Sequence, residues 1–220
     1  MGITTAQFYA PSLAVFAAVS ATYTNISVTT AYQRDAGILK RVRGTPLPAW
    51  IYLGGKIISA TLVAAIGVMI MLGVGALFFD VHIYVDRIPI LVLTFFVGVG
   101  TFAALGLLVA AIAPSGPAAT AIANATLLPV AFISGVFVIL PENPPRVLTA
   151  IANFFPLKHF VDPFVAAFSP EATRADFNWA DLAYLVLWGV VALVLAIRLF
   201  RWEPAGGEVR RGRARATSEA

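Results

Sequence analysis

Apolar residues in this chain gather into five long stretches that carry almost no charge, separated by shorter and more polar segments. A helix needs roughly 20 mostly apolar residues to cross the hydrocarbon core of a membrane, and each stretch is long enough. The pattern therefore predicts an all-α fold, a polytopic membrane helix bundle of five spans. The predicted spans cover about residues 8–30, 51–79, 88–113, 119–140 and 179–200.

The connection between the fourth and fifth predicted spans is rich in proline and holds two apolar pieces. These are 147-VLTAIANFF-155 and 160-FVDPFVAAF-168, and each is too short to span. A short apolar helix beside a membrane is typical of a re-entrant or interfacial segment. We therefore expect two short re-entrant helices that dip in from the outer face and turn at Pro156. Beside them, Lys158, His159 and Asp162 form either a structural ion pair or a polar rim on an exit route.

Composition supports the membrane assignment and excludes most enzyme chemistry. Hydrophobic residues make up 60% of the chain and charged residues 12%, against about 45–50% and about 25% in soluble domains. With no cysteine and two histidines, we expect no metal centre and no thiol catalysis. The glycine-rich runs 54-GGKI-57 and 98-GVGTFA-103 do not match nucleotide-binding loops, because Ile57 replaces a Ser/Thr and the second run lies inside a span. We expect no enzyme activity in this chain.

Basic residues are distributed unevenly and predict the orientation. Eleven of the fifteen lie between the first and second predicted spans, just inside the second, or after the fifth. Cytoplasmic loops carry an excess of Lys and Arg. We therefore expect a multi-pass protein of the cytoplasmic (inner) membrane, with residues 1–200 as the transmembrane domain and 201–220 as a basic cytoplasmic tail that binds no nucleic acid.

The loop between the first two predicted spans contains a short amphipathic helix. Ile38, Leu39 and Val42 share one stripe of that helix, with basic residues around them. Gly44 is a natural stop for it. Such a helix either contacts a partner protein or lies on the lipid surface.

Three motifs in this sequence resemble the ABC-2 type permease family. The segment 33-QRDAGILKRVRGTPLP-48 resembles the family's loop after its second membrane helix. The run 127-LLPVAFISGVFVIL-140 is similar to a Pro-x-x-Phe-x-Ser-Gly-x-Phe run in the fifth helix, and 154-FFPLKHFVDPF-164 to a Pro-Leu-x-x-x-x-Asp run before the last helix. Order and spacing agree with the family over about residues 6–200.

The resemblance implies the membrane subunit of an ATP-driven exporter, similar to the drug-exporting daunorubicin-resistance permeases. ATP and magnesium would then be bound by a separate cytoplasmic ATPase subunit and not by this chain. A second permease copy, identical or homologous, would complete the pair in the lipid bilayer. The substrate would be hydrophobic or amphipathic, such as a drug, a lipid or a glycoconjugate. Residues implied in the coupling helix that contacts the ATPase are Gln33, Arg34, Asp35, Gly37, Ile38, Leu39 and Val42, with Arg34 and Asp35 as its charged edge.

Family members usually have six spans, and this sequence resembles one that lacks the first. We therefore expect the lipid-buried faces that such a helix would cover to be exposed in these 220 residues.

A substrate path is expected between the first and fourth predicted spans, which carry polar residues that lipid-facing helices avoid. The alternative is that these polar residues only bond helix to helix. The expected path residues are Phe16, Thr24, Ser27, Asn124, Phe132, Ser134 and Phe137.

Two other functions compete with the exporter permease. A secondary transporter would need an ionisable residue in mid-membrane, and the predicted spans offer none there. A non-transporting immunity or scaffold protein would need no coupling helix. A phosphate-loop ATPase encoded by a neighbouring gene would favour the exporter permease.

Overall fold

The computed structural model describes residues 4–44, 49–138, 145–170 and 177–200. Within these ranges the regular structure is entirely helical. Five helices are long and apolar enough to cross a membrane, so the prediction of an all-α bundle with five spans is confirmed. They cover Thr5–Asp35, Ile51–Phe78, Val85–Ile112, Gly116–Ile133 and Trp179–Leu199.

The first span changes helix type in its middle. It consists of α1 (Thr5–Val19), the π-helical turn η1 (Ser20–Thr24) and α2 (Asn25–Asp35). Hydroxyl groups here donate to carbonyls of their own helix: Thr22 Oγ1 lies 2.8 Å from the oxygen of Ala18, and Ser27 Oγ donates to the oxygen of Tyr23. This internal bonding makes so polar a span tolerable in lipid.

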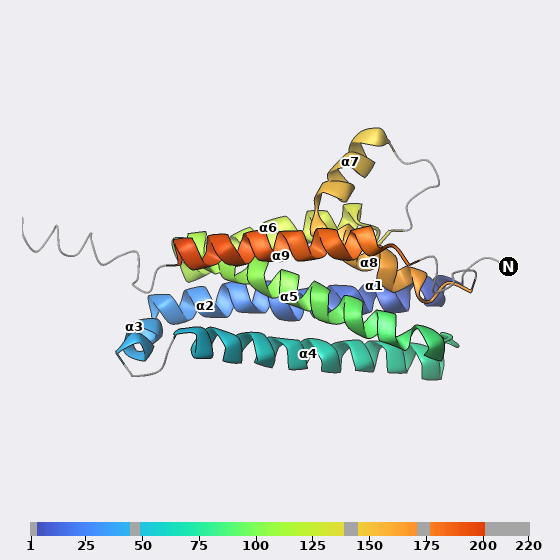
Figure 1. The fold of residues 1–220 in the computed structure, drawn as a ribbon, viewed down its shortest axis with the longest axis horizontal. Helices are drawn as coiled ribbons and strands as arrows, with labels where there is room; N and C mark the ends of the chain where they lie inside the picture. The colour runs from blue at the N-terminus through green and yellow to red at the C-terminus, as the bar shows by residue number, and fades with distance from the viewer. Residues whose placement is uncertain (1–3, 45–48, 139–144, 171–176, 201–220) are drawn as a thin grey trace, which may run out of the picture.

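The five spans run side by side along the long axis of the molecule (Figure 1). The short helix α3 and the last turn of α9 lie at one end, which we call the inner end, and the start of α1 and α8 lie at the other, the outer end. The loop expected in the cytoplasm and the end of the last span therefore share one end of the bundle. The remaining elements are α3 (Ile38–Arg43), α4 (Ala49–Phe78), η2 (Val85–Arg87), α5 (Ile88–Ile112), α6 (Gly116–Ile133), α7 (Arg146–Phe154), α8 (Pro156–Ala166) and α9 (Trp179–Leu199).

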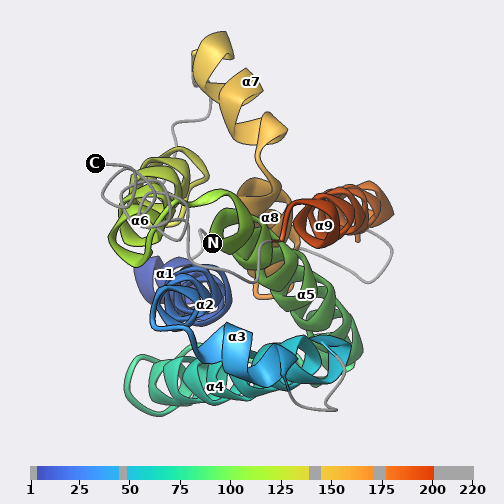
Figure 2. The same cartoon turned by 90° about the vertical axis from the view of Figure 1, so that its left-hand side faces the viewer.

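Helix α5 is the centre of the bundle (Figure 2). It packs most extensively against α9 and also against α2, α4, α6 and α8. Its buried face carries small residues such as Gly98, Ala103 and Ala110, which allow helices to approach closely in a membrane. At Gly106 the backbone of another element comes close, because an added Cβ would lie 2.8 Å from the carbonyl oxygen of Tyr23 in η1.

Helix α6 is shorter than its apolar pattern suggests. It begins at Gly116 and ends at Ile133, whereas hydropathy predicted residues 119–140, of which 139 and 140 lie outside the described residues. Gly135 adopts a left-handed conformation with φ of 76°, and the next amide, of Val136, donates back to the oxygen of Ala131. This conformation is cheap only for glycine and ends the helix while the sequence is still apolar.

Two short helices precede the last span, as predicted, and they break at Pro156. Helix α8 is packed into the outer end through three buried rings, Phe160, Phe164 and Phe168. Helix α7 instead projects away from the bundle (Figures 1 and 2). Its Val147 and Ile151 are exposed, so α7 is the least supported helix of the outer end.

Two polar residues fix α8 to other elements. The Gln7 amide nitrogen donates to the oxygens of Phe168 at 2.8 Å and His82 at 2.9 Å. Arg87 donates to the oxygens of Ala167 and Ser169. These bonds satisfy carbonyls that have no partner at a helix end, and they connect α8 to the first span and to the start of α5.

Candidate coupling segment and substrate groove

The coupling segment, residues 33–43, begins in the last turn of α2 and continues into α3. The chain turns at Ala36 and Gly37, and Gly44 follows the last residue of α3, so the predicted stop is confirmed. The Thr45, Pro46 and Leu47 of the motif lie outside the described residues, as does the basic tail 201–220.

Three consecutive residues of this segment bond to three different spans. Gln33 accepts a hydrogen bond from the Tyr52 hydroxyl of α4. Arg34 is buried and donates to the carbonyl oxygens of Ala110 at 2.8 Å and Ala113 at 2.7 Å, at the end of α5. The next residue, Asp35, contacts the third span, α6, through its carboxylate.

Asp35 bonds to the start of α6. Its Oδ2 accepts from the backbone amide of Gly116 at 2.6 Å, and its other oxygen lies 3.6 Å from the Arg34 guanidinium. A cation suits the negative end of a helix dipole and an anion the positive end. The Arg34–Asp35 pair therefore caps both helix ends that meet at the α5–α6 corner.

This arrangement corrects part of the expected partner contact. Arg34 was expected at the charged edge of a contact with another subunit, but its guanidinium is buried against its own chain. The apolar stripe is also divided: Leu39 is fully buried, Val42 is half-buried, and Ile38 is 41% exposed. The outward face of α3 therefore consists of Ile38 with the exposed Lys40 and Arg41.

A groove of about 400 Å³ runs between the first span and α6. Of the expected path residues, it brings Phe16, Thr24 and Asn124 together. Thr24 Oγ1 is buried and has no hydrogen-bond partner among the described residues. The groove thus combines an apolar wall with polar groups that can accept or donate. Its lining is Phe16, Ser20, Thr24, Asn25, Val28, Thr29, Thr120, Asn124, Leu127 and Leu128.

The other expected path residues divide into two sets. Phe137 stacks edge-on with Phe16 at 4.8 Å between ring centroids and lies 5.0 Å from Phe132, so the three rings form an aromatic cluster next to the groove. Ser27 and Ser134 are buried and do not line the groove. Ser27 donates within its own helix, so it makes neither the expected contact with the path nor the helix-to-helix bond of the alternative.

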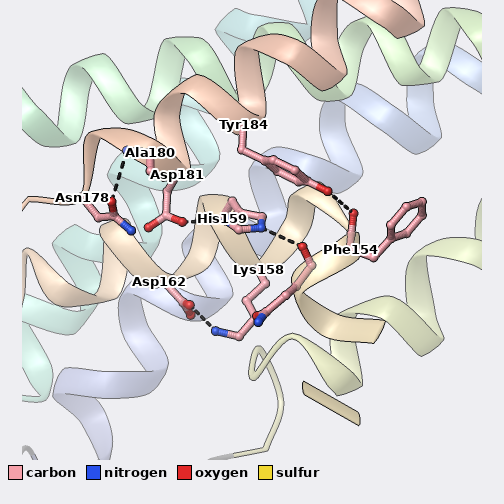
Figure 3. Close-up of polar contacts among 9 residues, drawn as sticks. Phe154, Lys158, His159, Asp162, Asn178, Ala180, Asp181 and Tyr184 are labelled. Carbon is pink, nitrogen blue, oxygen red and sulfur yellow. Dashed lines mark hydrogen bonds and ion pairs between the residues drawn. The ribbon is translucent and has the colours of Figure 1, made fainter. Parts of the chain in front are cut away.

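A polar cluster lies where α7, α8 and α9 meet (Figure 3). His159 lies between Asp181 of α9, at 2.5 Å, and the carbonyl oxygen of Asn153 in α7, at 2.8 Å. Lys158 and Asp162 form an ion pair along α8. The expected ion pair is therefore present. Within the described residues, no group of three or more His, Asp or Glu is placed to hold a metal ion.

Several contacts of the inner half had no clear signal in the sequence. Lys56 Nζ donates to the hydroxyls of Thr29 and Thr30. The groove residues of the first span could have been found, because Phe16, Ser20, Thr24 and Val28 recur every four residues and so share one helix face.

The partners of Arg34 are backbone atoms about 80 residues away in the sequence, and side-chain patterns give no signal for such contacts.

Comparison with protein families identifies one match. The model of the ABC-2 family transporter protein matches residues 3–198. A comparison with curated proteins found no match. Since the family match covers nearly the whole chain, including all five spans and the coupling segment, this protein belongs to the ABC-2 family of transporter proteins.

Proposed function

We propose that this ABC transporter permease is the membrane subunit of an exporter driven by a separate cytoplasmic ATPase, which binds ATP and magnesium. A second permease copy completes the transporter in the cytoplasmic membrane, with the inner end and the C-terminus facing the cytoplasm. The observation that carries the proposal is the bonding of Gln33, Arg34 and Asp35 to α4, α5 and α6. A force on the coupling segment would reach three spans directly.

The outward face of α3 is the proposed contact with the ATPase. Ile38 supplies an exposed apolar side chain, and Lys40 and Arg41 surround it with positive charge. Buried apolar anchors with a charged rim are typical of protein interfaces. Leu39 supports this face from beneath, because it is fully buried in the permease itself.

Replacing Ile38 tests this contact. We expect Ile38→Asp to reduce recovery of the ATPase at least tenfold when the permease is purified together with an ATPase from a neighbouring gene, since the change puts a charge into an apolar contact. The matched control is Val85→Asp, because Val85 is also exposed and lies in η2 at the outer end, away from the coupling segment. Membrane insertion is checked by the yield of the purified permease.

The lipid-surface alternative makes the opposite prediction for the same assay. If α3 only lies on anionic lipid, Lys40→Ser and Arg41→Ser weaken membrane contact and Ile38→Asp leaves ATPase recovery unchanged. Full retention of the ATPase by Ile38→Asp would therefore rule out the proposed docking face.

We propose that the groove between the first span and α6 is part of the substrate path. Its mixture of apolar wall and hydroxyl and amide groups suits a hydrophobic or amphipathic substrate. Phe16 supports this, since it lines the groove and also contacts Phe137 of the aromatic cluster.

Shortening the aromatic residues tests the path. We expect Phe16→Ala and Phe132→Ala each to lower the half-maximal inhibitory concentration of an exported hydrophobic drug about tenfold. The substrate would bind more weakly and be exported less, because burying an aromatic side chain is worth about 1.5–3 kcal/mol. Phe96→Ala is the control, since Phe96 is exposed on α5 and does not line the groove. The measurement is a dose–response panel of hydrophobic drugs in cells that express the transporter. An unchanged panel for both variants would favour purely structural roles for these rings.

A further inference from the structure

His159 lies between two groups that both accept hydrogen bonds. Its Nδ1 is 2.5 Å from a carboxylate oxygen of Asp181, and its Nε2 is 2.8 Å from the backbone oxygen of Asn153. A backbone carbonyl can only accept, so Nε2 must carry a hydrogen. A neutral imidazole has one N–H and one lone pair. Nδ1 would then present its lone pair to Asp181, and an ionised carboxylate cannot donate to it.

We propose that His159 and Asp181 form a proton-binding site that holds α7 against the outer end of the bundle. Both hydrogen bonds are made only when the pair holds one proton more than a neutral imidazole with an ionised carboxylate. That proton is on Nδ1, giving an imidazolium, or on Asp181, which then donates to Nδ1. The two arrangements have the same number of protons, so the proton belongs to the pair and not to either residue alone.

The site matters for α7 because it holds the end of that helix. The last carbonyls of a helix lack partners within it, and α7 has two of them satisfied by side chains. His159 donates to the oxygen of Asn153, and the Tyr184 hydroxyl of α9 donates to that of Phe154 at 2.9 Å (Figure 3). Otherwise α7 has little support, since Ala152 is its only buried residue among those described.

Loss of the proton leaves one N–H for two acceptors. An ionised carboxylate forms the stronger hydrogen bond, so the remaining N–H stays with Asp181 and Nε2 turns a lone pair toward the oxygen of Asn153. The two lone pairs repel, and of the two side-chain hydrogen bonds to the end of α7 only that of Tyr184 remains. Histidine side chains in general change charge between pH 5 and 8, so a comparison of these two pH values is the natural test of the site.

Other titratable groups near His159 come from α8 and α9. Asp162 is the important one, because burial raises its pKa while its ion pair with Lys158 opposes that shift. This carboxylate therefore takes up a proton at a higher pH than an ordinary aspartate. Asp162 accepts a hydrogen bond from Lys158 within α8 and not from α7. On the other packed elements, the Tyr184 ring lies tilted against the imidazole, with 4.3 Å between the ring centroids. Arg87 donates to carbonyls at the far end of α8, and Arg146 is the first residue of α7, at the end away from His159.

Spin labels on α7 and α9 test the proposal. The chain has no cysteine, so Ala150→Cys with Val186→Cys, both exposed positions, gives one labelled pair in the full-length protein in lipid nanodiscs. We expect a single narrow distance distribution at pH 5 and a broadened one at pH 8. Equal distributions at the two pH values would overturn the proposal.

Three substitutions in the labelled protein separate the site from its surroundings. Asp181→Asn should give the narrow distribution at both pH values, because its amide donates to Nδ1 and frees the imidazole N–H for Asn153. His159→Gln should give the broad distribution at both, since one amide cannot donate to both acceptors in this geometry. Asp162→Asn, the control for the neighbouring carboxylate, should keep the wild-type pH response. A wild-type response in Asp181→Asn, or loss of the response in Asp162→Asn, would overturn the assignment.

The proton itself can be followed in the unlabelled protein. With His82→Asn, His159 is the one histidine left in the sequence, so ¹⁵N-histidine labelling reports a single imidazole by NMR. We expect its ring nitrogen resonances to change over the same pH interval as the spin-label distances. If the imidazole changes its protonation state but the spin-label distances do not change, protonation of His159 does not control the position of α7. This comparison does not depend on the stability of the substituted proteins.

Discussion

Replacing Arg34 by alanine is expected to disconnect the coupling segment from the spans while the ATPase stays bound. The change removes both hydrogen bonds to the end of α5. Hydrogen bonds to charged groups are worth about 1.5–3 kcal/mol each, so we expect a loss of at least about 3 kcal/mol at this corner. Coupling between two sites is typically about 1–3 kcal/mol, or about 5- to 150-fold. The loss is therefore large enough to abolish coupling.

The measurement is the accessibility of the groove to a thiol reagent, which requires no known substrate. A single cysteine at Asn124, which is exposed and lines the groove, is alkylated with and without ATP and vanadate. We expect the alkylation rate to respond to nucleotide in the parent protein and not in Arg34→Ala, although the same amount of ATPase is recovered with both. Arg198→Ala is the matched control, because Arg198 is an exposed arginine at the inner end of α9 and lies outside the coupling segment.

Two results would contradict this view of Arg34. If Arg34→Ala loses the ATPase, the residue acts at the subunit contact after all. If the groove still responds to ATP, the bonds to Ala110 and Ala113 do not transmit the movement. Arg34→Lys should restore the response only in part, because an ammonium lacks the planar fork that reaches two acceptors at once.

Adding one methyl group at Gly106 is expected to destabilise the whole bundle. The new Cβ would lie 2.8 Å from the carbonyl oxygen of Tyr23 and 3.2 Å from that of Thr22. Both are backbone atoms that move only if the first span moves away from α5. Overpacking of this kind costs about 1–3 kcal/mol, more than the roughly 0.5–1 kcal/mol that alanine gains over glycine inside a helix.

Gly100 provides the control within the same helix. An added Cβ at Gly100 meets nothing within 4 Å, so Gly100→Ala should leave the thermal midpoint unchanged or slightly raised. Gly106→Ala should lower it by several degrees when both variants are unfolded in the same detergent. Equal midpoints would show that the first span and α5 are not as tightly packed as these distances indicate.

Much of the fold follows from hydropathy alone, because a membrane requires long apolar helices and the chain contains five of them. The break at Pro156 was also predictable, since proline fixes its own backbone and restricts the residue before it. The end of α6 was not, because the left-handed Gly135 interrupts an apolar run that hydropathy continues to residue 140.

The coupling role of the segment around Arg34 and Asp35 stays a prediction, but the expected outward position of the Arg34 side chain was wrong. Arg34 and Asp35 instead cap a corner formed by backbone atoms of α5 and α6. A sequence pattern shows that an arginine is present, but it does not show whether the arginine faces outward or bonds to a distant carbonyl. Gln7 was missed for the same reason, since its partners are the backbones of His82 and Phe168.

The π turn at Ser20–Thr24 has a consequence for how the first span tolerates changes in length. A π turn accommodates one extra residue locally. The side chains of α1 and α2 therefore point in the same directions as they would in a regular α-helix that is one residue shorter. Deleting one residue within the turn would leave Gln7 on α8 and Arg34 on the α5–α6 corner. The same deletion elsewhere between these two residues would rotate one half by about 100° and remove one set of contacts. Insertions and deletions in this span should therefore be confined, among related permeases, to these five positions.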